Sequence, residues 1–173
     1  MFTLVDPSQI LRAIVERLQD VPPLLKELRD EKKRIRAYYD APPESTSLVE
    51  AIHAMPVPGI LIVWQGSSPG AIGSFETVRH TFSIYLRAGD SVGDPDQFAT
   101  GYYRLWRLIC EGDPENIVEP GTVDTKLPLW LAQIHPGCDP LESIPAISRQ
   151  TDADGFDFFE MQLSFNENGR LRG

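Results

Sequence analysis

The feature that most constrains the fold is the alternation in the stretch "HTFSIYLRAG", residues 80–89. One face of an extended chain would carry His80, Phe82, Ile84 and Leu86, and the other would carry Thr81, Ser83, Tyr85 and Arg87. Successive side chains of a strand point to opposite faces of the sheet. The pattern therefore predicts a strand over residues 75–88 with one buried face, as in an antiparallel sheet. Nothing on the polar face resembles a catalytic set.

Two further stretches predict strands. In "FDFFEMQLSFNE", residues 156–167, apolar residues alternate with a polar set that contains Glu160, Gln162 and Ser164. The turn sequence "DADG" precedes this stretch and joins it to residues 143–152, which predicts a hairpin. The stretch "GILIVWQG", residues 59–66, has an unbroken apolar centre and predicts a strand covered on both faces. The Gly/Ser/Pro-rich residues 67–74 after it are expected to form a loop.

Helix starts are written twice in the same way, as "DPSQ" at residues 6–9 and "DPDQ" at residues 94–97. Each offers Asp as N-cap, Pro at the first helical position and Gln three residues after the cap. Apolar residues then recur at helical spacing, up to Pro22 in the first case and Gly112 in the second. A third, highly charged helix is expected over residues 23–39, and a short one before Pro56.

This order of elements predicts an α+β fold, in which two or three helices pack on one face of a mostly antiparallel sheet. The length of 173 residues fits a single domain over residues 1–173. Within it we expect a charged helical segment and linker at 24–50, a loop-rich insertion at 112–142 and a flexible tail at 168–173. The stretch "LPLWLAQI" in the insertion fits either a strand or an irregular core segment.

The charge of the chain is unevenly distributed. The net charge is −9, yet residues 26–36 hold six basic and three acidic side chains. Only Tyr38 and Tyr39 could serve as nearby aromatic platforms, so a solvated or partner-facing surface is favoured over a nucleic-acid site. We call residues 26–36 the basic stripe. The candidate partner-docking residues are four in the basic stripe and two in the Gly/Ser/Pro-rich loop at residues 67–74, namely Lys32, Lys33, Arg34, Arg36, Ser68 and Gly70.

Nothing in the sequence supports catalysis, since it lacks the common nucleophile, phosphate-loop and metalloprotease motifs, and an enzyme stays an open alternative. Cys110 reads as a buried helix residue, and His80 as a core histidine. His135 and Cys138 have a metal-like spacing but no second pair to complete a zinc site. We expect no catalytic residue, metal or cofactor. The longest apolar run, "ILIVW", is far too short to cross a membrane, and no signal peptide is expected.

Three segments together resemble a known family: "PGILIVWQGSSPGAIGSFETVRHTFSIYLRAGD", "QFATGYYRLWRLIC" and "FFEMQLSF". The order of these segments and their pattern of apolar and polar residues are similar to those of the tail terminator (tail completion) and minor tail proteins of long-tailed bacteriophages. The resemblance covers residues 57–111 and 143–167, about half of the chain. It leaves the charged segment and the loop-rich insertion unexplained.

The resemblance implies a virion protein of the tail or neck, made in the host cytoplasm. Such a protein forms a homohexameric ring that caps the tail tube, stops its polymerisation and meets the head–tail connector. Its partners would be copies of itself, the tube protein and the connector, while DNA passes through without specific binding. The candidate subunit or lumen face consists of Thr81, Ser83, Tyr85, Arg87, Glu160, Gln162 and Ser164. Another connector, tube or baseplate component is an alternative, and a cytoplasmic binding module or small enzyme is a further one.

Overall fold

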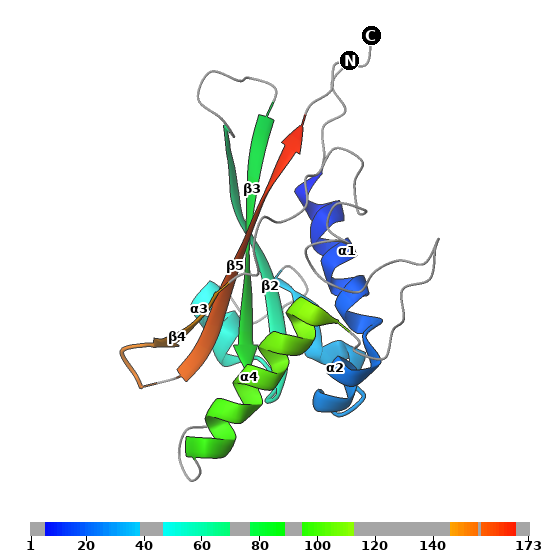
Figure 1. Ribbon diagram of the computed structural model, residues 1–173. Coiled ribbons are helices and arrows are strands. Elements are labelled where there is room, and N and C mark those ends of the chain that lie inside the picture. Colours follow the sequence, from blue (N-terminus) through cyan, green and yellow to red (C-terminus); the bar gives the residue numbers. More distant parts are fainter. Residues whose placement is uncertain are drawn as a thin grey trace.

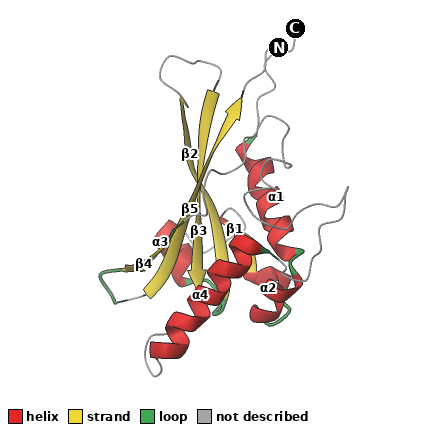
Figure 2. Ribbon diagram, viewed as in Figure 1, coloured by secondary structure: helices red, strands yellow, loops and turns green. Residues whose placement is uncertain are grey.

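Five strands form one mixed sheet in the computed structural model shown in Figure 1. The structure describes residues 6–38, 47–69, 77–88, 95–112, 146–155 and 157–168. The strand order is β1–β2–β3–β5–β4. The bounds are β1 Ile35–Ala37, β2 Gly59–Pro69, β3 Thr77–Arg87, β4 Ile147–Thr151 and β5 Asp157–Asn168. The predicted α+β fold is confirmed, as Figure 2 shows by element type.

All strand pairs are antiparallel except β1 with β2. The three central strands are long: β2 and β3 pair from Gly59↔Arg87 to Pro69↔Val78, and β3 pairs with β5 from Thr77↔Asn168 to Leu86↔Phe159. The outer strands are short: β1 pairs with three residues of β2, and β4 pairs with five residues of β5. In Figure 1 the ends of β2, β3 and β5 therefore continue past the helices at the top of the view.

The first face of the sheet is covered by α1 (Pro7–Gln19), α2 (Pro22–Glu27) and α4 (Pro95–Glu111). As predicted, Asp6 caps α1, and its carboxylate accepts a hydrogen bond from Ser8 N at 2.9 Å. The main core lies between these helices and the sheet. Its largest fully buried side chains are Tyr102, Phe82, Ile10, Ile14, Leu18, Leu24, Leu28, Ile35, Ile60, Ile62, Ile84 and Leu86.

The opposite face of the sheet is covered in part by the short helix α3 (Leu48–His53). Ser47 caps this helix by accepting a hydrogen bond from Glu50 N. A second, smaller core forms beneath it from Ala51, Ile52, Met55, Leu61, Val63 and Tyr85. Because both faces are covered here, β2 buries consecutive residues, which confirms the prediction from its unbroken apolar centre.

The charged helix predicted over residues 23–39 is confirmed only at its start, as α2, and is wrong for residues 28–38. The helix ends at Glu27, and Arg29 and Asp30 then take left-handed conformations, with φ of 60° and 58°. A left-handed residue cannot continue a right-handed helix. The chain instead forms one 3-10 turn, η1 (Lys32–Arg34), and enters the sheet as β1. Ile35 and Ala37 are buried strand residues of β1.

The boundary expected at residue 67 is also wrong, because β2 continues to Pro69 and Ser68 is a strand residue. The pairing with β3 is irregular between Trp64 and Gly66, where one extra residue forms a bulge. Most of the predicted loop, including Gly70, lies outside the described residues, as do the 113–142 part of the insertion and the tail after Asn168. In the described part of the chain, no helix is long and apolar enough to cross a membrane.

Other predictions are confirmed residue by residue. Cys110 is buried in α4, and His80 is buried in β3, where its Nδ1 lies 2.7 Å from the Ser67 hydroxyl. The turn between β4 and β5 begins at Asp152, whose carboxylate accepts a hydrogen bond from Asp154 N. Gly155 completes this turn with a φ of 76°. His135 and Cys138 lie outside the described residues.

Candidate assembly surfaces

The sheet register brings the seven predicted face residues into one group, which we call the polar row. Thr81 lies opposite Ser164, Ser83 opposite Gln162, and Tyr85 opposite Glu160. Arg87 continues the row at the end of β3. These residues share the face that also carries α3. The alternation within each strand predicted which residues share a face of that strand, and the pairing of β3 with β5 joins the two sets.

Hydrogen bonds within the chain connect much of the polar row. Ser83 Oγ donates to Glu160 Oε1 at 2.9 Å, and Gln162 Nε2 donates to the same oxygen at 3.3 Å. The Thr81 and Ser164 hydroxyls lie 3.2 Å apart. Tyr85 OH accepts from Gln65 Nε2. Burial raises the pKa of Tyr85, and the nearby charge of Glu160 raises it further.

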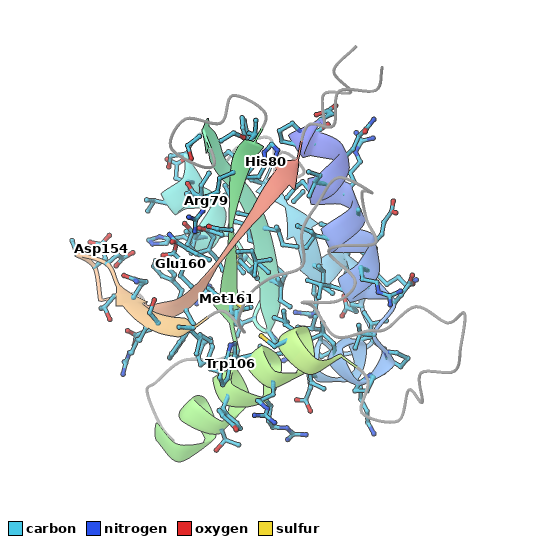
Figure 3. All side chains as sticks on the ribbon, turned by 45° about the horizontal axis from the view of Figure 1, so that its top comes forward. Arg79, His80, Trp106, Asp154, Glu160 and Met161 are labelled. Carbon is cyan, nitrogen blue, oxygen red and sulfur yellow. The ribbon has the colours of Figure 1, made fainter. Side chains whose placement is uncertain are left out.

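Helix α3 divides the polar row into a covered part and an accessible part. Ser83, Tyr85 and Arg87 are buried, and Arg87 Nη1 donates to the His53 carbonyl at the end of α3. The His53 ring also contacts the Asp152 carboxylate in the β4–β5 turn. The accessible part of the row consists of exposed Gln162 and half-buried Thr81, Glu160 and Ser164. Figure 3 shows Glu160 on this side, between the labelled Asp154 and Arg79.

The basic stripe is divided in the same way. Lys32 and Lys33 are exposed, and each lies within 4 Å of an acidic partner, Asp20 or Glu31. Arg34 belongs to the folded body: its side chain is only 12% exposed, and it donates to Glu31 and to the Pro58 carbonyl. Its role in partner docking stays a prediction, with little of the side chain accessible to a partner. Arg36 is half-buried and donates to the Lys33 carbonyl at 2.7 Å.

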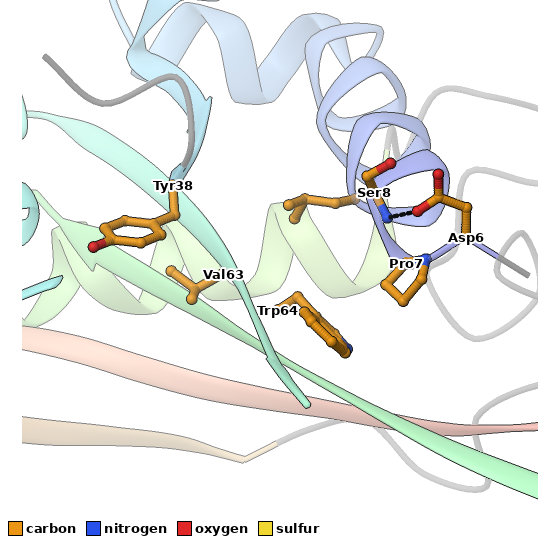
Figure 4. A pocket seen from close by; sticks show the side chains of 7 residues that line it. Asp6, Pro7, Ser8, Tyr38, Val63 and Trp64 are labelled. Carbon is orange, nitrogen blue, oxygen red and sulfur yellow. Dashed lines mark hydrogen bonds between the residues drawn. The ribbon is translucent and has the colours of Figure 1, made fainter. Parts of the chain in front are cut away.

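Sequence reasoning missed a groove beside the outer part of β2, which we call the β2 slot. Strand β1 ends at Ala37, opposite Ile62, while β2 runs on for seven residues. The slot has a volume of about 260 Å³ and lies directly beyond the end of β1 (Figure 4). It is lined by Asp6, Pro7, Ser8, Leu11, Tyr38, Val63 and Trp64.

The lining of the β2 slot comes from both faces of the sheet. Tyr38 and Val63 belong to the small core under α3, while Leu11 belongs to the main core under α1. Trp64 lies between them and Pro7 and is 45% exposed, one of three large apolar side chains exposed among the described residues. Gln65, Ser67 and Ser68 beyond it are also exposed. The slot therefore meets β2 at Val63 and Trp64, and the exposed part of the strand continues beyond it.

A second strand edge extends on the opposite side of the sheet. Strand β4 pairs with β5 only as far as Met161, whereas β5 continues to Asn168. Among the described residues, no strand pairs with the outer side of residues 162–168. The alternating pattern of residues 156–167 predicted a long β5, whereas nothing in the sequence predicted that β4 would be so much shorter. Among the residues that the structure describes, the outer end of the sheet thus has three paired strands, and no further strand pairs with its edge on either side.

The described residues include no group of three or more His, Cys, Asp and Glu side chains placed to hold a metal ion. Asp6, the one carboxylate of the β2 slot, serves as the cap of α1, and its hydrogen bond from Ser8 N lowers its pKa. A scan against protein-family models finds no match for this chain, and a search of curated proteins finds none either.

Proposed function

We propose that this protein is a structural virion protein of the tail terminator class, which closes into a ring at the end of a tail tube. One observation carries the proposal: among the described residues, the outer end of the sheet has a strand edge on each side, one on β2 and one on β5, with which no other strand pairs. The resemblance of the three sequence segments to tail terminators points to the same class.

Two different edges on opposite sides of one subunit suit a head-to-tail contact. Such a contact joins a surface of one copy to a different surface of the next, and it closes into a ring when the rotation between copies allows. An exposed edge also presents unpaired backbone N–H and C=O groups, which readily pair with another chain. The ring would place the accessible part of the polar row toward a neighbouring subunit or the lumen.

The charge of the chain suits a passage for DNA. With a net charge of −9, the ring walls would repel the phosphate backbone, so that DNA would pass without adhering. The exposed Lys32 and Lys33 form a small basic surface on this acidic molecule, which suits docking to an acidic region of the tube or of the head–tail connector.

The proposal is tested by adding the purified protein to the tail-tube protein of the same genome while tubes polymerise. A terminator should stop elongation at a low molar ratio and appear as one extra ring at one tube end in negative-stain images. Copolymerisation along the tube would indicate a tube component instead. Tubes of unchanged length with bare ends would contradict the proposal.

A further inference from the structure

We propose that the β2 slot receives the outer half of β5, residues 162–168, from a second copy of this chain. The inference rests on the proposed ring and names the contact that would build it. The occupant would add a strand to the sheet beside residues 63–69, in line with β1. The sheet of one subunit would then continue into the sheet of the next.

The shape of the β2 slot suits a strand. It begins where β1 leaves the sheet, and its lining comes from both faces, with Tyr38 and Val63 on one and Leu11 on the other. A strand sends alternate side chains to opposite faces, so a strand in this position would place side chains against both groups. Backbone hydrogen bonds to the β2 edge would supply affinity, and the pocket beside Trp64 would supply specificity, as in other strand additions.

The direction of β5 agrees with that position. Strand β2 is antiparallel to β3 and β3 is antiparallel to β5, so β2 and β5 run in the same direction. Copies related by rotation about a ring axis keep this relation, and β5 of the neighbour would therefore lie parallel to β2. Strand β1 already pairs with β2 in parallel fashion, so the added strand would repeat a geometry that this edge supports.

The two edges also match in length and charge. Each offers seven residues beyond its short neighbouring strand. Residues 63–69 carry no charged side chain, and residues 162–168 carry only Glu167. Strand edges that must stay unpaired are commonly protected by charged residues or kept very short. Here β4 carries Arg149 and β1 has three residues, so those two outer strands have such protection.

The test uses three variants of the full chain. Trp64→Lys places a charge in the β2 slot. The double variant Gln162→Lys/Ser164→Lys places two charges on the outer half of β5, which should keep it from pairing with another strand. Val49→Lys in α3 is the control, because Val49 is another exposed apolar residue, at 57% exposure, and lies outside both edges. Circular dichroism and thermal unfolding verify that each variant folds. Sedimentation velocity measures assembly at matched concentrations.

We expect the control to assemble like the wild type and each edge variant alone to sediment as a monomer. An equimolar mixture of the two edge variants should form a dimer that grows no further, because one intact slot meets one intact β5 edge. Full assembly of Trp64→Lys, or a mixture that stays monomeric, would overturn the inference. Neither result would contradict the proposed function. That proposal is contradicted separately if the wild type neither forms rings nor caps tubes.

Discussion

At the residue scale, Gly59 leaves very little room for a side chain. A Cβ atom there would lie 2.3 Å from the Pro56 carbonyl oxygen. We expect Gly59→Ala to lower the free energy of unfolding by roughly 1–3 kcal/mol, the usual cost of overpacking. Gly101 in α4 is the matched control, because its Cβ would meet Ala88 at an ordinary 3.5 Å. Gly101→Ala should stabilise the helix by up to about 1 kcal/mol. Urea unfolding of both variants makes the comparison, and equal effects would contradict it.

Arg34 and Lys33 are neighbours in sequence with different roles. Arg34 is mostly buried and donates to the Pro58 carbonyl, which would lose this donor in Arg34→Ala. We expect that variant to lose roughly 1–3 kcal/mol of unfolding free energy. Lys33 is 74% exposed, so Lys33→Ala should stay within about 0.5 kcal/mol of the wild type. An unfolding free energy of Arg34→Ala equal to that of the wild type would contradict a structural role for Arg34.

Tyr85 gives the polar row a measurable pH response. Burial, followed by the charge of Glu160, raises the pKa of Tyr85 above its ordinary value of 10.0. The stability that neutral Tyr85 contributes is therefore fully present below pH 10 and is lost as the pH rises through the folded-state pKa. Glu160→Gln should lower the pKa of Tyr85, which should still stay above its ordinary value because Tyr85 remains buried. NMR titration of the tyrosine ring carbons measures this, and an unchanged pKa would remove Glu160 as a cause.

At the element scale, the sequence predicted the helices and strands whose determining residues lie within the segment itself. Helices α1 and α4 were found because their Pro-led starts and apolar spacing lie within the segments themselves. Strand β1 was missed because its three residues are held by pairing with β2, more than twenty residues later in the chain. Lys and Arg are good helix formers, so propensity favoured a helix there until tertiary pairing overrode it.

Helix α3 is six residues long, and its cap should matter more than propensity. Ser47→Ala removes the acceptor for Glu50 N and should cost about 1 kcal/mol of unfolding free energy. Ser47→Asp keeps an acceptor and should remain near the wild type. Hydrogen exchange at the α3 amides locates the effect. Protection that is unchanged in Ser47→Ala would show that packing on Leu61 and Tyr85 alone holds the helix.

At the scale of the whole molecule, the sequence predicted the polar row but not its availability. Alternation in β3 and β5 places those residues on one face, whereas their burial depends on α3 and on the contact of His53 with Asp152. The β2 slot could not be predicted, because it arises from the difference in length between β1 and β2. Trp64, at the end of the apolar run, was its one visible signal.

The absolute mass of the purified protein, measured by light scattering with negative-stain images of the same peak, tests the ring most directly. The ring account predicts a closed species with a central hole. Six copies of the 19.4 kDa chain would give roughly 116 kDa. A protein that stays at 19.4 kDa, both alone and after incubation with tail tubes, would contradict the account.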